Sequence, residues 1–257
     1  MKTRRNLFLA IGVIFLFSFP GVAHAQSGWR LDVGAERSDV TLYDSDAIWW
    51  SQYLQVGWVR EQTGGWFGGV ENQERFGLRD VVFHTKGYRR FGDWTVAGGM
   101  AGTPDADFWF HRSFEGEISR RLVGSVVASG AYRLMQFPTT TVHQPQIALT
   151  WYHRRGEVQG RLFLTRNSMR DGYSATGLLQ SSCRIASRVQ FIGAVAYGDR
   201  IFNIEALAEG PATSWMARSA LRIDLSRSLA IEIGGGYARE ELQFEQRTIG
   251  ISIRRSF

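Results

Sequence analysis

The chain has 257 residues, a formal net charge of +6 and one cysteine, Cys183. A single cysteine excludes an internal disulfide, so the fold must be stable without one. No apolar stretch of ~18 residues follows Ala25, which excludes a membrane-spanning helix from the rest of the chain.

The N-terminus has the pattern of a secretory signal peptide. Lys2, Arg4 and Arg5 precede an apolar run from residue 7 to residue 19, and the small residues of Ala23-His24-Ala25 form a cleavage site. We therefore expect residues 1–25 to be removed and residues 26–257 to form one domain. Removal takes away three cations, and export argues against nucleic acid as a partner.

The remaining sequence consists of short segments in which apolar and polar residues alternate. Ile249, Ile251, Ile253 and Phe257 fall on one face of the last segment, and polar residues fall on the other. A period of two is typical of a β-strand with two different environments. The pattern predicts strands at 28–40, 47–60, 66–76, 78–90, 94–102, 107–120, 122–134, 141–153, 156–167, 172–185, 187–199, 213–225, 228–240 and 243–257.

The composition of the two faces favours a membrane barrel. The apolar face is aliphatic with aromatic residues toward the strand ends, and the polar face mixes charges with glycine and serine. This pattern is typical of apolar-out, polar-in transmembrane strands. The fold class we expect is all-β, a closed antiparallel β-barrel of the bacterial outer membrane with about fourteen strands. Twelve strands, or a soluble β-sandwich, are the alternatives.

The C-terminal strand ends in an aromatic residue. A terminal Phe257 on the same face as Ile249, Ile251 and Ile253 is similar to the signal that the barrel-insertion machinery reads in outer-membrane proteins. Arg255 departs from that pattern, because the position is usually apolar. We expect a weakened insertion signal, with the insertion machinery and outer-membrane lipids as partners.

Diffuse motifs carry a family resemblance over residues 65–257. The matching residues are Arg75-Phe76-Gly77, Asp80, Tyr88, Pro104, Arg112-Ser113-Phe114-Glu115, Arg121-Leu122, Gly130-Ala131-Tyr132-Arg133, Val142 and Leu149-Thr150-Trp151-Tyr152. With these residues the sequence resembles the YaiO family of outer-membrane β-barrels, which implies the barrel and its location but no catalytic residues. Related barrels occur beside polysaccharide-export machinery, so the resemblance also implies a role in handling glycans.

One group of residues is a weak catalytic candidate. On the expected strand 107–120, His111, Ser113 and Glu115 share a face, and His-x-Ser with a nearby Glu resembles the arrangement in lipid A deacylases. The same strand would place Phe108, Phe110 and Phe114 toward lipid and the candidates inward, away from a lipid substrate. We therefore expect ordinary lumen residues, with no metal site and no cofactor.

The inward-facing charges are nearly balanced in sign. Balanced charges predict a lumen filled by ion pairs, whereas a ring of one sign would indicate ion selectivity. A narrow or plugged barrel is therefore expected. The lumen charges are Arg30, Asp32, Glu36, Lys86, Glu115, Glu117, Arg161, Arg218, Arg222, Asp224, Glu232 and Arg254.

Arginines gather at one set of strand ends. With both termini in the periplasm, this set becomes a periplasmic rim: Arg60, Arg89, Arg90, Arg120, Arg121, Arg154, Arg155, Arg188 and Arg227. One interpretation is a ring that binds anionic lipid headgroups. The other is a docking ring for a glycan or an acidic periplasmic partner.

Three functions remain open from the sequence. The first is a non-enzymatic barrel that supports surface polysaccharide export or envelope structure. The second is a narrow channel for small solutes. The third is an outer-membrane enzyme that modifies lipid A or glycans.

Overall fold

The computed structural model describes residues 27–43, 45–60, 63–168, 172–199, 213–240 and 244–257. These residues form fourteen antiparallel strands closed into one barrel, which confirms the predicted fold class and the count of fourteen rather than twelve. A closed barrel also excludes the soluble sandwich. The expected signal peptide, residues 1–25, lies outside the described residues. The described part of the chain holds no helix long and apolar enough to cross a membrane.

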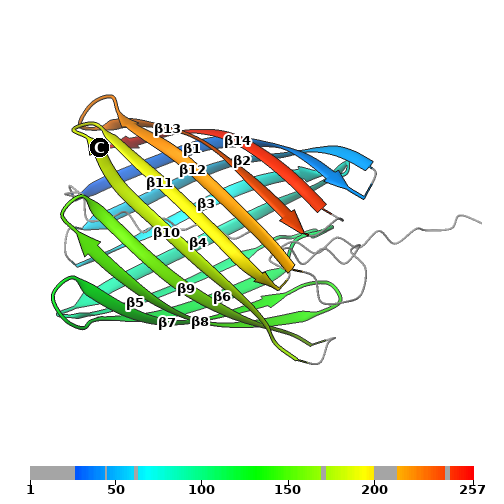
Figure 1. Cartoon of the computed structure of the whole chain (residues 1–257), viewed down its shortest axis with the longest axis horizontal. Helices are drawn as coiled ribbons and strands as arrows, with labels where there is room; N and C mark the ends of the chain where they lie inside the picture. The colour runs from blue at the N-terminus through cyan, green and yellow to red at the C-terminus, as the bar shows by residue number, and fades with distance from the viewer. Residues whose placement is uncertain (1–26, 44, 61–62, 169–171, 200–212, 241–243) are drawn as a thin grey trace, which may run out of the picture.

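The strands follow chain order around the barrel (Figure 1). They are β1 (Gly28–Leu42), β2 (Ser45–Arg60), β3 (Gly64–Arg75), β4 (Leu78–Phe91), β5 (Trp94–Gly102), β6 (Arg112–Arg121), β7 (Val126–Gln136), β8 (Thr141–His153), β9 (Gly156–Asn167), β10 (Ser174–Ala186), β11 (Val189–Asp199), β12 (Thr213–Asp224), β13 (Leu229–Glu240) and β14 (Phe244–Ser256).

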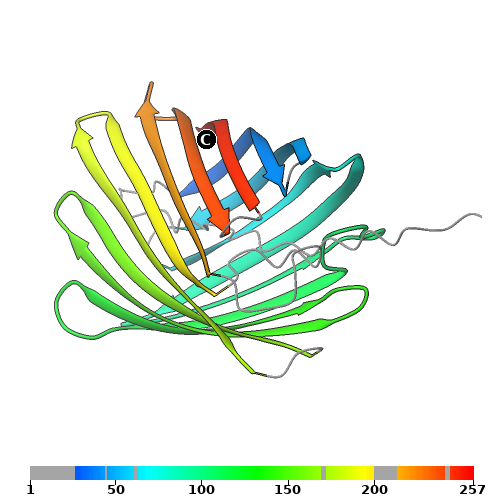
Figure 2. The same ribbon diagram turned by 45° about the vertical axis from the view of Figure 1, so that its right-hand side comes forward.

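The first and last strands close the barrel. β1 pairs with β14 along its length, from Arg30 opposite Ser256 to Leu42 opposite Phe244. Every described strand therefore has a partner on both sides, and the sheet that these strands form has no open edge. Only such a closed sheet can satisfy its hydrogen bonds inside lipid. Figure 2 shows the tilted strands as a continuous wall around the lumen.

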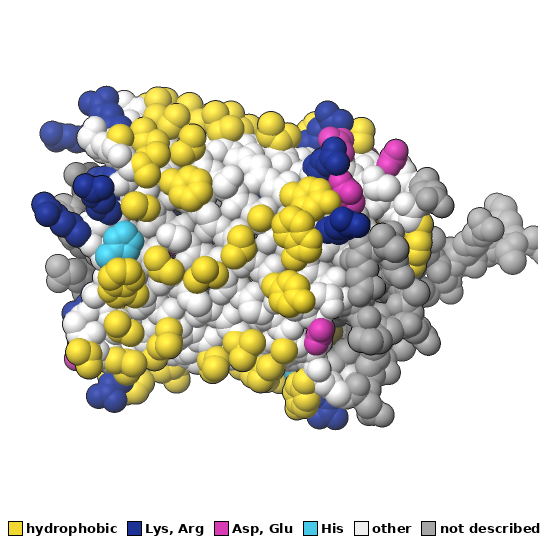
Figure 3. All heavy atoms as spheres, in the orientation of Figure 1, with side chains coloured by type: hydrophobic (Ala, Val, Ile, Leu, Met, Phe, Trp, Pro, Cys, Tyr) yellow, Lys and Arg dark blue, Asp and Glu magenta, His cyan; other side chains and the backbone are white. Residues whose placement is uncertain are grey.

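The outer surface carries an apolar band with aromatic rings near both ends (Figure 3). Large aliphatic side chains such as Leu54, Ile118 and Ile147 are exposed on it. Trp29 and Trp66 pack edge to face at 5.8 Å, and Trp215 and Tyr237 pack at 5.1 Å. An exposed apolar band between aromatic girdles is the surface that a bilayer requires.

The two ends of the barrel differ. The terminal end, where β1 begins and the chain ends at Phe257, has tight turns such as Gly92-Asp93 between β4 and β5. Gly92 has a φ of 59°, a conformation that favours glycine. The loop end carries the longer connections, including residues 103–111 between β5 and β6.

The structure corrects one predicted strand. We expected a strand at 107–120, but β6 begins at Arg112, and residues 107–111 belong to the β5–β6 connection. Phe108 and Phe110 are 1% and 3% exposed, so the expectation that they face lipid is wrong. Phe114, which lies within β6, is exposed on the outer face as expected.

Candidate functional site

Residues 103–111, which we call the plug loop, form an inward-directed segment at the loop end. Phe108, Trp109 and Phe110 are three consecutive bulky residues, and a strand would expose at least one of them on each face. Folding the segment inward buries all three. The loop is also pinned at its base, because the Thr103 N–H donates to the His111 carbonyl at 3.1 Å.

A single carboxylate of β4 anchors the plug loop. Asp80 is 1% exposed, and its two oxygens accept hydrogen bonds from the backbone N–H groups of Asp107 (2.9 Å), Phe108 (3.0 Å) and Trp109 (2.7 Å). Bonds from neutral donors to a charged acceptor contribute roughly 1.5–3 kcal/mol each. Asp80 therefore fixes the loop through its backbone, a role that the sequence did not indicate.

A buried cation completes the anchorage. The Arg75 guanidinium at the end of β3 lies 4.6, 5.4 and 5.5 Å from the ring centres of Trp49, Phe108 and Trp109. It also donates to the Gln73 side chain at 2.6 Å, and Gln73 in turn donates to Glu71. A cation over aromatic faces gains most when water is excluded, as it is here.

An apolar layer surrounds the plug loop inside the barrel. Inward side chains from β1, β2, β4 and from β10 to β14 pack with the three plug aromatics. Hydrophobic constrictions of this kind gate channels by excluding water. The members from the wall are Val40, Trp49, Val82, Leu178, Ala194, Ala196, Met216, Ala238 and Phe244.

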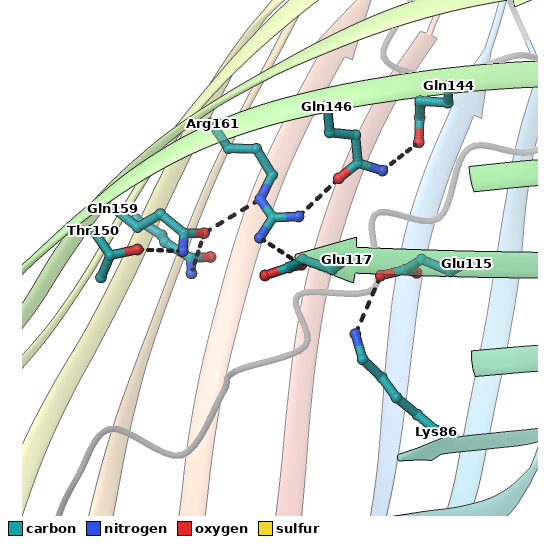
Figure 4. A network of polar contacts seen from close by, with 9 residues as sticks. Lys86, Glu115, Glu117, Gln144, Gln146, Thr150, Gln159 and Arg161 are labelled. Carbon is teal, nitrogen blue, oxygen red and sulfur yellow. Dashed lines mark hydrogen bonds and ion pairs between the residues drawn. The ribbon is translucent and has the colours of Figure 1, made fainter. Parts of the chain in front are cut away.

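The middle of the lumen contains networks of ion pairs and amides. Arg161 on β9 reaches Glu117 on β6 at 3.5 Å and donates to Gln146 at 2.8 Å (Figure 4). On the same side, Lys86 lies 3.2 Å from Glu115. Gln159 extends the network by donating to Thr150 at 2.7 Å. The two ion pairs bridge strands that do not pair with each other, whereas the amide contacts join the paired strands β8 and β9.

The opposite wall carries a second group of pairs. Asp32 binds two cations at once, because Arg30 donates to one oxygen at 2.9 Å and Arg254 donates to the other. Arg222 binds Glu232 at 2.7 Å. Of the sequence-predicted lumen charges, Asp224 lies apart from these pairs and lines the cavity at the terminal end.

Arg218 and Glu36 form a pair that lies flat against the wall. They come from β12 and β1, with β13 and β14 between them. Gly236 lies opposite Arg218 in the register, and Gly250 lies opposite Glu36. A Cβ at Gly236 would lie 2.7 Å from Arg218 Cγ, and one at Gly250 would lie 2.9 Å from Glu36 Cγ. The two glycines thus make room for the pair.

A cavity of 1960 Å³, which we call the vestibule, occupies the terminal end. It is lined by the terminal turns and reaches inward to Glu117, Gln159 and Gln180. Six residues of the predicted rim line it: Arg60, Arg90, Arg121, Arg154, Arg155 and Arg227. Four further arginines join them, namely Arg30, Arg184, Arg222 and Arg254.

The vestibule is strongly basic. Its described lining holds ten arginines but only four carboxylates, those of Asp93, Glu117, Glu157 and Asp224. Figure 3 shows basic side chains gathered at this end, whereas both signs occur at the loop end. The near-balance of the mid-lumen charges therefore does not extend to the terminal end.

The rest of the predicted rim lies elsewhere. Arg89 and Arg120 lie on the outer face, 5.3 Å and 4.9 Å from the ring centres of Phe91 and Trp94. Arg188 lies in the turn between β10 and β11. The sequence analysis predicted a single rim of arginines. In the structure, some of these arginines lie on the outer surface and others line the vestibule.

The weak catalytic candidates have separate surroundings. His111 is exposed in the plug loop, whereas Ser113 is 3% exposed and accepts a hydrogen bond from Arg133 at 3.1 Å. Glu115 pairs with Lys86 instead. Among the described residues, no group of three or more His, Cys, Asp or Glu side chains could hold a metal ion.

The residues of the predicted insertion signal lie together on the outer face of β14. Ile249, Ile251, Ile253 and Phe257 are all exposed there. Arg255, the departure from the pattern, lies with its guanidinium 4.9 Å from the centre of the Phe257 ring.

Solved outer-membrane proteins share this architecture at very low sequence identity. The CymD monoaromatic hydrocarbon channel superposes with a TM-score of 0.62 at 9% identity, covering 90% of this chain and 89% of that one. A bacterial polysaccharide outer membrane secretin gives 0.58 at 10% identity, covering 90% and 99%. Omp33 of Acinetobacter baumannii gives 0.53 at 9% identity, also covering 90% and 99%.

Sequence comparison gives the family. No curated protein matches the chain. The model of the YaiO membrane β-barrel domain matches residues 31–198, well over half of the chain. This protein therefore belongs to the YaiO family of membrane β-barrels.

Proposed function

We propose that this protein is a gated, non-enzymatic channel of the outer membrane, with the plug loop as its gate and a surface polysaccharide in transit as its cargo. The observation that carries the proposal is the lumen itself. A vestibule of 1960 Å³ opens at the terminal end, and the apolar layer around Phe108, Trp109 and Phe110 occupies the loop end.

The size of the vestibule favours a large cargo. Sites for small molecules usually have volumes of about 300–1,000 Å³, well below the volume of the vestibule. Small solutes are the alternative cargo, and the low-identity likeness to CymD, titled a hydrocarbon channel, gives no preference between the two.

The placement of the candidate catalytic residues supports a function without catalysis. A nucleophilic serine needs a general base within hydrogen-bond reach, and buried Ser113 is instead bonded to Arg133. His111→Ala and Ser113→Ala should therefore leave lipid A acylation unchanged. Loss of a lipid-modifying activity in either variant would show instead that the protein is a lipid-modifying enzyme.

Single-channel recording in planar bilayers tests the gate. Asp80→Asn removes the charge that holds three backbone N–H groups, so the plug loop should leave the lumen more often. We expect rare openings in the unaltered protein and a clear rise in open probability in the variant. Deletion of residues 104–110 should give a steady conductance.

A matched control removes a carboxylate from the same end. Glu74 is exposed on β3, so Glu74→Gln should leave the openings unchanged. Heat-modifiable migration on gels checks that each variant is folded. A steady conductance in the unaltered protein would show that the plug loop is no gate. Absence of any conductance in the deletion variant would show that the barrel is no channel.

A further inference from the structure

The vestibule carries positive charge that its own walls do not neutralise. Arg60, Arg90, Arg121, Arg154, Arg155 and Arg227 line it, and none of them forms an ion pair with a carboxylate in the described part of the chain. Elsewhere in the lumen, arginines such as Arg161 and Arg218 do have acidic partners. Six arginines without a carboxylate partner are thus gathered in one cavity of the described structure.

The arginines lie at successive depths. Arg154, Arg155 and Arg227 occupy the terminal turns, whereas Arg222 lies within β12, two positions before the strand ends at Asp224. A strand advances about 3.3 Å per residue, so Arg222 lies roughly 7 Å of strand inward from the turn. The cavity therefore presents guanidinium groups at two depths.

The floor of the vestibule has an excess cation as well. Arg30, Arg222 and Arg254 lie within electrostatic reach of one another, but among the described residues only two carboxylates, Asp32 and Glu232, bind them. Asp32 divides its two oxygens between Arg30 and Arg254. The positive potential therefore extends from the rim to the floor, and walls of low polarizability concentrate such a field.

We propose that the vestibule binds polyanionic sugar chains, which carry a carboxylate, sulfate or phosphate group on successive units. This inference rests on the proposed function and specifies its cargo. The planar guanidinium pairs with each of these groups through two parallel hydrogen bonds. Arginines at two depths fit a ligand whose negative charges repeat along its length, and a cavity of 1960 Å³ accommodates several sugar units.

Binding to the purified protein in detergent micelles tests the cargo without requiring the channel to open. The probes are an oligomer of sulfated dextran, a neutral dextran oligomer of equal length, and inorganic sulfate. We expect the sulfated oligomer to bind with an affinity that falls as salt is added, because the attraction is electrostatic. Neutral dextran should not bind, and inorganic sulfate should bind far more weakly.

Three exposed arginines of the terminal turns give the sharpest variant. Replacing Arg154, Arg155 and Arg227 together by Gln breaks no ion pair of the described structure, so the barrel should fold. Each exposed ion pair with the ligand contributes modestly, and the loss of three should weaken binding of the sulfated oligomer by about tenfold. The control is Arg89→Gln with Arg120→Gln, on the outer face, which should leave binding unchanged.

The outcomes of the binding experiment test the polyanion site independently of the proposed gate. Equal binding of neutral and sulfated dextran, or an equal loss in the outer-face control, would overturn the polyanion site. Binding of inorganic sulfate as tight as that of the oligomer would also overturn it, since the site would then recognise single ions. An acidic peptide that binds better than the sulfated oligomer would reassign the vestibule to a protein partner. These binding measurements can still be interpreted if the conductance experiment shows that the plug loop is no gate, because binding does not require the channel to open.

Discussion

The guanidinium of Arg120 lies 4.9 Å from the centre of the Trp94 ring on the outer face of the barrel. Its chain neighbour Arg121 lines the vestibule. The same division occurs on β4, where Arg89 lies over Phe91 and Arg90 lines the vestibule. Because side chains alternate along a strand, each of these two Arg-Arg pairs supplies one cation to the outside and one to the lumen. The two interpretations of the rim can therefore be tested on different residues.

The outer arginines should strengthen insertion into anionic membranes. Arg89, Arg120 and Arg255 lie over aromatic rings at the level of the terminal girdle. Each cation near an anionic membrane contributes about 1 kcal/mol of binding free energy. Replacing all three by Gln should therefore lower the refolding yield in vesicles that contain anionic lipid. The loss should shrink as salt screens the headgroups. Tryptophan fluorescence during refolding provides the measurement.

The inner arginines give the matched control for insertion. Arg90→Gln with Arg121→Gln removes two cations at the same end without touching the outer face. Refolding yield should be unchanged in this variant. If both sets lower the yield equally, the outer arginines have no special contact with headgroups.

The buried cation at the loop end should stabilise the closed lumen. Arg75→Met keeps the apolar length of the side chain but removes its charge from the rings of Trp49, Phe108 and Trp109. A desolvated cation–π contact contributes about 2 kcal/mol, so the midpoint of urea unfolding should fall. The plug loop should also open more often in bilayer recordings.

A control for Arg75 lies on the neighbouring strand. Arg79 is exposed and bonds only to the side chain of Asn72 among the contacts described. Arg79→Met should leave both the unfolding midpoint and the openings unchanged. An unchanged midpoint in Arg75→Met would mean that packing of the aromatic rings alone holds the loop.

Strand periodicity predicted the barrel because each strand meets two environments that differ sharply. Lipid selects apolar residues such as Ile249 and Ile251, and the lumen selects polar ones such as Ser252 and Arg254. The alternation survives along most strands, so both the closed barrel and the count of fourteen could be predicted. It cannot fix where a strand ends, and the expected strand at 107–120 began too early for that reason.

The plug loop could not be predicted from periodicity because its burial depends on distant residues. Asp80 and Arg75 act on Phe108 and Trp109 from strands β4 and β3, and nothing local to the loop requires either contact. One signal was available. The run Phe108-Trp109-Phe110 breaks the alternation, and a run of aromatics between Pro104 and a strand indicates a segment buried on all sides.

The glycines beneath the Arg218–Glu36 pair should be needed for stability. Gly236→Ala with Gly250→Ala places each new methyl group within 3 Å of Arg218 or Glu36, so the pair must leave the wall. Crowding of this kind costs about 1–3 kcal/mol. Urea unfolding in vesicles should show a lowered midpoint.

Two other glycines on neighbouring strands give the comparison. Gly116 and Gly130 have nothing within 4 Å of the Cβ position. Alanine at both should leave the midpoint unchanged or raise it slightly, since alanine restricts the unfolded chain. A similar drop in both double variants would mean that the strands themselves, rather than the ion pair, require glycine.

The orientation of the barrel can be tested with single cysteines in a Cys183→Ser background. Short turns face the periplasm in bacterial barrels, so the terminal turns and the vestibule should open inward. Arg155→Cys should react with a membrane-impermeant maleimide only after the outer membrane is permeabilised. Thr139→Cys, exposed in the loop-end connection between β7 and β8, should react on intact cells. The reverse labelling would turn the vestibule toward the medium, and its anionic ligand would then arrive from outside the cell rather than leave it.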